Sequence, residues 1–146
     1  MTPPPSDPTP TGAIPLIPQP DHGQVSHEVP KERVVAKLPT PAEDPQWYRT
    51  AVFYEVLLHS FFDSNDDGTG DFEGLRQKLD YLAWLGVDAL WIPPFYPSPM
   101  ADGGYDISDY TAVDPRYGNM NNFNRLVEEA HDRGIRIVID MVMNHT

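Results

Sequence analysis

The sequence has 146 residues, 40% of them hydrophobic, and a formal net charge of −12. Such an acidic chain offers no basic stripe to neutralise phosphates, so we expect no nucleic-acid partner. The absence of cysteine excludes a disulfide framework and a thiolate zinc site, and no apolar run approaches the length of a membrane span, so we expect a cytoplasmic protein without a membrane partner.

Prolines divide the chain into two parts. Twelve of the 17 prolines precede Gln46, in a stretch that lacks apolar periodicity. A segment of this composition cannot bury enough apolar surface to fold, and it favours polyproline-like conformations. We therefore predict a disordered, proline-rich arm over residues 1–45 and a folded domain over residues 46–146.

The first half of the folded part predicts a strand, a helix and a second strand. "AVFYEVLL" is a continuous apolar run, typical of a strand buried on both faces, which we expect to end near His59. "DFEGLRQKLDYLAWLG" has apolar residues at three- and four-residue spacing, which predicts one amphipathic helix capped at Gly86. "VDALWI" then predicts a second buried strand. We expect Trp84 and Trp91 to lie in the core.

The same unit recurs in the second half. "NNFNRLVEEAHDRG" predicts a helix ending at Gly134, and "IRIVIDMVM" predicts a third strand. The order β-α-β-α-β indicates an α/β fold with right-handed crossovers and a parallel sheet. In such folds the loops at the carboxyl ends of the strands carry the functional residues.

Four aspartates and an asparagine crowd the loop "DSNDDGTGD", residues 63–71. Hard cations such as Ca²⁺ prefer several oxygen ligands around a sharp glycine turn, which Gly68 would supply. Gly74 stands where an EF-hand needs a bidentate glutamate, which excludes a true EF-hand. The alternative to a metal site is a polar turn in which Asp71 caps the following helix. We favour a structural Ca²⁺ or Mg²⁺ site with the ligands Asp63, Asn65, Asp67, the Thr69 carbonyl and Asp71.

Two further groups of polar residues follow the second and third strands. "GGYDISDY" places Tyr105 and Asp106 in a long loop, and this pair could clamp a sugar between an aromatic face and a hydroxyl-accepting carboxylate. Asp140, Asn144 and His145 lie at the end of the buried third strand, where polar side chains are costly unless they serve a site. We therefore expect one functional rim at the carboxyl edge of the sheet.

Several linked motifs carry a family resemblance. "AVFYEV", "DSNDDGTGDFEGL", "LDYLAWLGVDALWIPPFYPSP", "GGYDISDY" and "GIRIVIDMVMNH" resemble, in order and spacing, the start of the alpha-amylase superfamily, glycoside hydrolase family 13. Within it they look most like the trehalose synthases. The resemblance covers residues 47–146, and it implies the first three strands and two helices of a (β/α)8 TIM barrel.

The resemblance also implies roles for single residues. Tyr105 would be the aromatic platform under a glucose ring, Asp106 would hold its distal hydroxyl, and His145 would bond the same ring. Asp140 would support the catalytic arginine and nucleophile from below. Asn144 matches an asparagine that ligates Ca²⁺ in many members, and residues 63–71 match a metal-binding loop.

The resemblance places the catalytic carboxylates outside this chain. Retaining glycosidases use a nucleophile and an acid/base, which in this family belong to later strands. We therefore expect the chain alone to be inactive and the full-length enzyme to interconvert maltose and trehalose by retaining intramolecular glucosyl transfer. The resemblance leaves room for a homo-oligomer. One alternative is another enzyme of the superfamily, namely an oligo-1,6-glucosidase, an alpha-glucosidase or a sucrose-type transglucosidase. The other is a non-enzymatic calcium-binding module.

Overall fold

The computed structural model describes residues 43–145. The predicted arm lies outside this range apart from residues 43–45, so the proposed boundary at residue 45 stays a prediction. The elements in chain order are η1 (Trp47–Arg49), β1 (Phe53–Glu55), α1 (Leu58–Phe61), α2 (Phe72–Gln77), α3 (Leu79–Leu85), β2 (Ala89–Ile92), η2 (Pro115–Tyr117), α4 (Met120–Asp132) and β3 (Arg136–Ile139). None of the helices within residues 43–145 has the length and apolar character needed to cross a membrane.

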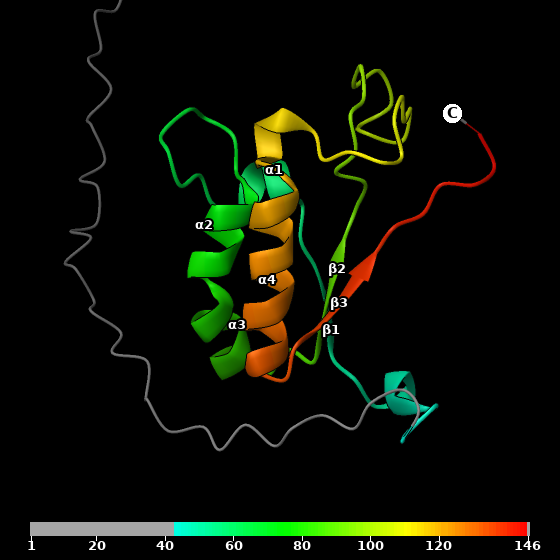
Figure 1. Cartoon of the computed structure of the whole chain (residues 1–146). Coiled ribbons are helices and arrows are strands. Elements are labelled where there is room, and N and C mark those ends of the chain that lie inside the picture. Colours follow the sequence, from blue (N-terminus) through cyan, green and yellow to red (C-terminus); the bar gives the residue numbers. More distant parts are fainter. Residues whose placement is uncertain (1–42, 146) are drawn as a thin grey trace, which may run out of the picture.

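The three strands form one parallel sheet in the order β1-β2-β3. Phe53 is aligned with Ala89, and Leu90 with Ile137. Helices α2, α3 and α4 lie together on one side of the sheet, and the long loops gather at one end of it (Figure 1). The predicted α/β fold with parallel strands is therefore confirmed.

The first strand is shorter than its apolar run predicts. It spans Phe53–Glu55, and Leu58–Phe61 form a helical turn instead of continuing the strand. The amide of Val56 still donates to the Trp91 carbonyl oxygen over 2.8 Å, but the Gly70 amide bonds the carbonyl of His59 over 2.7 Å. The loop that follows thus folds back and bonds the His59 carbonyl oxygen. Because this oxygen is no longer available for sheet pairing, the strand ends before His59.

The predicted helix over residues 72–85 is divided into α2 and α3. Lys78 stands between them with φ −101° and ψ 2°, outside the helical range. The helical spacing of apolar residues still holds across the break, because Phe72, Leu75, Leu79 and Leu82 are all fully buried. Gly86 ends α3 in the left-handed conformation, as predicted.

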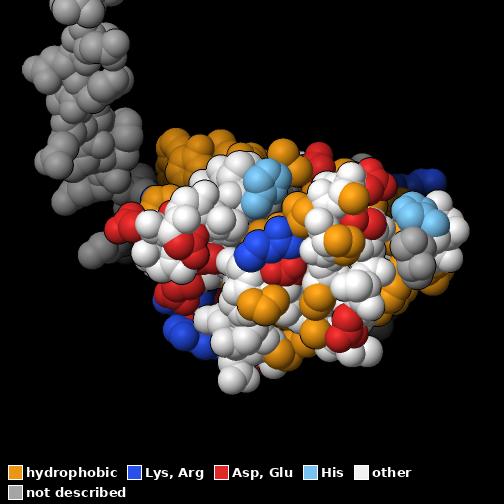
Figure 2. Space-filling view, turned by 90° about the horizontal axis from the view of Figure 1, so that it is seen from above, with side chains coloured by type: hydrophobic (Ala, Val, Ile, Leu, Met, Phe, Trp, Pro, Cys, Tyr) orange, Lys and Arg blue, Asp and Glu red, His pale blue; other side chains and the backbone are white. Residues whose placement is uncertain are grey.

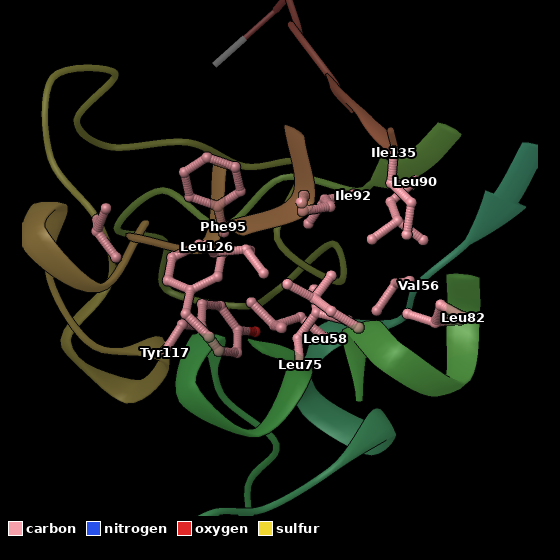
Figure 3. Close-up of a cluster of buried hydrophobic side chains, with 14 of the residues drawn as sticks. Val56, Leu58, Leu75, Leu82, Leu90, Ile92, Phe95, Tyr117, Leu126 and Ile135 are labelled. Carbon is pink, nitrogen blue, oxygen red and sulfur yellow. The ribbon is translucent and has the colours of Figure 1, made fainter. Parts of the chain in front are cut away.

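The core lies between the sheet and the helices (Figure 3). Val56, Leu90 and Ile92 from the strand side meet Leu75 and Leu126 from α2 and α4. Three aromatic rings add edge and tilted contacts, since the Phe72, Phe95 and Phe123 centroids lie 5.1–5.5 Å apart. These contacts hold the sheet in place at the end from which the long loops leave it.

The two tryptophans expected in the core are exposed. Trp84 on α3 is 55% exposed and Trp91 on β2 is 38% exposed. The prediction was wrong for Trp84 because it lies on the side of α3 opposite the buried Leu79 and Leu82. It was wrong for Trp91 because the described helices cover a single face of the sheet. Trp91 alternates with the buried Leu90 and Ile92 and therefore points away from that face.

Candidate functional site

Two loops meet at the carboxyl edge of the sheet. Residues 93–114 follow β2 and residues 140–145 follow β3, and both segments leave the same end of the sheet (Figure 1). The Tyr105 hydroxyl donates to Asp140 Oδ2 over 2.9 Å. The Tyr110 hydroxyl donates to the Val142 carbonyl over 2.6 Å and lies 3.1 Å from the His145 carbonyl oxygen. The structure thus ties the predicted rim together across two strands, and we call these two segments the rim.

Tyr105 is fixed in place as a neutral hydrogen-bond donor. Its side chain is half-buried, and this burial raises the pKa of the Tyr105 phenol, an effect that the bond to Asp140 reinforces. Gly104 precedes it with φ +100°, and a Cβ there would lie 3.2 Å from the Pro94 carbonyl oxygen. The glycine therefore allows the turn that presents Tyr105 to Asp140.

Asp106 is held as a carboxylate. Its Oδ1 accepts from the Ser98 hydroxyl over 2.7 Å, and its Oδ2 accepts from the Ala101 amide over 2.8 Å. The bond from Ser98 lowers the pKa of Asp106, so the group is charged at neutral pH. A carboxylate has about four lone-pair sites, so two remain for the hydroxyls of a ligand.

Asn144 and His145 are exposed at the end of the described chain. The backbone of His145 reaches the rim through its contact with Tyr110. Within residues 43–145, the structure bonds Tyr105 to Asp140 but makes no bond between the side chains of Asp106 and His145. The predicted convergence of three side chains on one ring therefore stays a prediction, although their segments share one rim.

The acidic loop, residues 63–71, is folded around its own amides. Asp63 Oδ1 accepts from the amides of Asn65 and Asp66, and Asp63 Oδ2 accepts from the Gly68 amide over 2.7 Å. Asp67 Oδ1 accepts from the Thr69 amide over 2.8 Å. The bond from Gly68 lowers the pKa of Asp63, so this carboxylate stays charged. The loop is therefore a turn held by its own hydrogen bonds, with Asp63 as a charged carboxylate at its centre.

Asp71 closes the loop and caps α2. This carboxylate is only 6% exposed, and its Oδ1 accepts from the Gly74 amide over 2.6 Å while Oδ2 accepts from the Ser64 hydroxyl over 2.8 Å. Both oxygens serve the fold, as the alternative interpretation of this loop predicts. The cap does not by itself remove Asp71 from the predicted ligands, because each carboxylate oxygen keeps a second lone pair.

The donor atoms of the loop are of the kind that a hard cation prefers, but their positions suit a cation less well. Its donors are carboxylate, amide and carbonyl oxygens, which are the ligands that Ca²⁺ and Mg²⁺ prefer. Among the residues that the structure describes, however, no three His, Asp or Glu side chains converge closely enough to hold an ion. The fit therefore rests on Asp63, Asn65 and Asp67 together with backbone oxygens.

A polar pocket adjoins the acidic loop. It has a volume of about 210 Å³, and its lining includes Asn65, Asp67 and Asp71 of the loop together with Gly118 and Asn122. Viewed from above, acidic side chains lie on the left of the molecule, the side on which Figure 1 places the loop, and also on the right (Figure 2). Asn65 and Asp67 are exposed, so solvent reaches their side-chain oxygen atoms.

The sequence prediction missed Ser98 and Tyr110 of the rim, and it missed Arg116, which lies in η2 and contacts the rim. Ser98 bonds Asp106, Tyr110 bonds the segment after β3, and the Arg116 Nη2 atom donates to the Ser98 carbonyl over 3.3 Å. Tyr110 ends the motif "GGYDISDY" and could have been found there. Ser98 and Arg116 lie among ordinary loop residues, and no periodicity points to them.

Comparisons with known proteins show the family to which the sequence belongs. Residues 55–146 match the model of the alpha-amylase catalytic domain. The chain is 58% identical over 112 residues to a trehalose synthase from Pimelobacter sp. (strain R48), a match that covers 77% of this chain and 20% of the relative. It is 53% identical over 102 residues to the trehalose-6-phosphate hydrolase of Escherichia coli (strain K12), covering 70% of this chain and 18% of the relative.

Solved structures agree as well. A crystal structure of a MutB mutant in complex with the substrate sucrose matches with a TM-score of 0.68 and 54% identity, covering 69% of this chain and 18% of that chain. The chain thus spans about a fifth of the length of the curated relatives it matches. The parallel strands are accordingly part of a TIM barrel, and the chain belongs to the alpha-amylase family.

Proposed function

We propose that this chain supplies the first part of the catalytic barrel of a trehalose synthase, which interconverts maltose and trehalose by glucosyl transfer. The support is the 58% identity to a trehalose synthase. That identity covers 20% of the relative, so the activity belongs to a whole barrel of which these residues form one sector.

The observation that carries the proposal is the bonded rim. Tyr105 is held by Asp140 at 2.9 Å, and Asp106 beside it is held as a charged carboxylate. An aromatic face can cover the C–H surface of a glucose ring while a carboxylate accepts from its hydroxyl groups. We assign the non-reducing glucose of maltose to Tyr105, Asp106 and His145, with Asp140 as the group that would support the catalytic arginine and nucleophile of the later strands.

The reaction would be a double displacement. A nucleophilic carboxylate from a later strand attacks the anomeric carbon of the bound glucose, and an acid/base carboxyl about 5–5.5 Å away protonates the leaving oxygen. The released glucose turns within the site, and its anomeric hydroxyl attacks the glucosyl intermediate while the acid/base takes up the proton. Trehalose forms, or glucose forms where water attacks instead. The residues described here hold the sugar during both steps.

A second candidate is another alpha-glucosyl enzyme of the same family. The 53% identity to a trehalose-6-phosphate hydrolase and the 54% identity to a sucrose-bound MutB structure favour it. The proposed contacts of the rim are with a single glucose ring. Maltose, sucrose and trehalose 6-phosphate all contain such a ring. The choice between these substrates rests on groups that contact the second half of the disaccharide.

Product analysis separates the two candidates. The protein encoded by the complete reading frame that contains these residues should convert maltose to trehalose, measured by chromatography, more rapidly than it hydrolyses sucrose or trehalose 6-phosphate. Tyr105→Phe should lower kcat/KM on maltose by about tenfold, because it removes one hydrogen bond to a charged group. Tyr81→Phe is the matched control, since Tyr81 is exposed on α3. Hydrolysis without any trehalose would favour the second candidate.

We also propose that the acidic loop binds a structural Ca²⁺ or Mg²⁺ ion. Asp63, Asn65, Asp67 and the Thr69 carbonyl would be the ligands, with Asp71 as a ligand that also caps α2, and the ion would stiffen the connection between β1 and α2. Asn144, exposed after β3, remains a proposed ligand of a separate ion.

A further inference from the structure

The side chain of Asp106 is oriented by a serine eight residues earlier. The Ser98 hydroxyl donates to Asp106 Oδ1 over 2.7 Å and accepts from the Met100 amide over 2.8 Å. Because the oxygen of Ser98 accepts from Met100, its single hydrogen is free to point at Asp106. With Oδ2 held by the Ala101 amide, both carboxylate oxygens have fixed partners. The plane of the carboxylate is therefore set before any ligand arrives.

The backbone that carries Ser98 is itself anchored. The Pro97 carbonyl accepts from the amide and the hydroxyl of Ser108, each over 2.9 Å. The Ser98 carbonyl accepts from Arg116 Nη2, and Arg116 Nε donates to Asp114 Oδ1 over 2.8 Å. Asp114 is only 5% exposed, and its amide bonds the Phe95 carbonyl at the start of the same loop. An ion pair with a buried carboxylate thus holds Ser98 at a fixed place on the rim.

We propose that Ser98 is a positioning residue that presets the orientation of Asp106 toward the hydroxyl groups of a bound α-glucoside. This inference rests on the sugar-binding role proposed above for Asp106. A carboxylate that can rotate loses conformational freedom on binding, whereas a preset carboxylate does not, so Ser98 strengthens binding without touching the sugar. Because the sugar is held alike in the ground state and the transition state, the effect belongs in KM more than in kcat.

The test uses the protein of the complete reading frame, with maltose as the substrate and calorimetry of maltose binding beside the kinetics. We expect Ser98→Ala to raise KM and the dissociation constant by about tenfold, with kcat changed less than about twofold. Ser98→Thr keeps a hydroxyl and should restore most of the affinity. Thr111→Val is the matched control: it removes a hydroxyl from the same loop, whose bond goes to Asp109 and not to Asp106.

A double-mutant cycle distinguishes positioning from a general loosening of the loop. If Ser98 acts through Asp106, Ser98→Ala should change kcat/KM by less than about twofold in an Asp106→Ala background, because the group that it orients has gone. Additive losses in the double variant would overturn the inference, as would a Ser98→Ala protein with the affinity of Thr111→Val.

Failure of the proposed function gives a different result. A wild-type protein that neither binds nor converts maltose or sucrose would overturn both proposals together. A wild-type protein that is active while Ser98→Ala binds maltose normally would overturn the positioning role alone.

Discussion

At the scale of single residues, much of the negative charge at one end of the sheet is fixed by local hydrogen bonds. Asp63, Asp106 and Asp114 all have pKa values held below the ordinary range, because amides, a hydroxyl or a guanidinium bond their oxygens. Each of these aspartates lies in a loop at the carboxyl end of the sheet. The fold therefore keeps several negative charges there at neutral pH.

Asp114 links stability to pH. Its side-chain bond from Arg116 lowers its pKa, so its contribution is present above the unfolded pKa of about 3.9 and is lost as the pH falls through the lower folded value. We expect Asp114→Asn to lower the free energy of unfolding at pH 7 by about 1–3 kcal/mol, and the difference from wild type to shrink below about pH 4. Urea denaturation of the protein from the complete reading frame, between pH 2.5 and 7, measures this.

Asp80→Asn is the control for this measurement. Asp80 pairs with Arg133 over 2.7 Å, but its side chain is 73% exposed. Removing this surface pair should change stability by less than about 1 kcal/mol at any pH. An Asp114→Asn protein whose deficit is constant from pH 2.5 to pH 7 would contradict the assignment.

Single residues of the rim could be predicted from the motifs, but their partners could not. Tyr105 and Asp106 stand out as an aromatic and an acid beside paired glycines, and Asp140 stands out as an acid after a buried strand. The bond between Tyr105 and Asp140 joins residues 35 positions apart. Sequence spacing fixes periodicity within an element but not contacts between loops, which depend on the path of each loop.

At the scale of elements, glycines decide how closely α1, α2 and the acidic loop pack. A Cβ at Gly74 on α2 would lie 1.9 Å from the Phe62 carbonyl oxygen. The first turn of α2 therefore touches the backbone ahead of the acidic loop. Such close approach explains why α2 has a glycine in its first turn despite the poor helix propensity of this residue.

Substituting two glycines separates packing from backbone strain. Gly74→Ala should destabilise by roughly 3 kcal/mol or more, because the clash outweighs the gain in helix propensity. Gly86→Ala, at φ +93° with nothing within 4 Å of its Cβ, should cost only about 1–2 kcal/mol of left-handed strain. Thermal denaturation measures both. A Gly74→Ala protein as stable as wild type would mean that α2 does not pack against Phe62 in this way.

The acidic loop provides a metal-dependent prediction. With Ca²⁺ at about 100 times its dissociation constant, the bound state should gain about 2.7 kcal/mol, seen as a higher melting temperature that a chelator reverses. Asp67→Asn should weaken this response, because Asp67 is a proposed ligand. Asp66→Asn is the matched control in the same loop and should respond like wild type. A melting temperature unaffected by Ca²⁺, Mg²⁺ and chelator would contradict the metal.

Element boundaries were harder to predict than element order. The apolar run after Ala51 continues through Leu58. The sheet pairing ends at Val56, because amides of the following loop bond carbonyl oxygens beyond Val56, such as that of His59. The break at Lys78 has neither glycine nor proline to announce it. Apolar periodicity indicates which side chains are buried. Side chains on both sides of the strand end and of the break at Lys78 are buried, so the pattern shows neither boundary.

At the scale of the whole molecule, the described sheet is open. Beyond the helix-covered face, large apolar side chains are 38–84% exposed, namely Phe53, Trp91, Ile139, Met141 and Met143. Strands β1 and β3 each have one neighbour in the described sheet. Open strands and exposed apolar surface promote association between chains.

We therefore expect the isolated polypeptide of residues 1–146 to associate or to melt without cooperativity. Sedimentation velocity at micromolar concentrations should show species larger than the monomer, and the dye ANS should bind. The same polypeptide with Trp91→Lys and Met143→Lys should associate less, because charge on these positions opposes edge and face pairing. A monomeric wild-type chain with a cooperative melt would contradict this expectation.

The parallel order of the strands was predictable because alternating strands and helices admit few topologies. That order brings the loops after β2 and β3 to one edge, and the bond from Tyr105 to Asp140 joins them there. The central claim is that this edge holds a single glucose ring. This claim depends on the family of the chain, on the parallel order of its strands and on the orientation of Asp106.

A crystal structure of the protein from the complete reading frame, soaked with maltose, tests this claim most directly. We predict one glucose ring against the face of Tyr105, with Asp106 and His145 each within about 3 Å of its hydroxyl groups. A sugar bound elsewhere, with Tyr105, Asp106 and His145 facing away from it, would contradict the account.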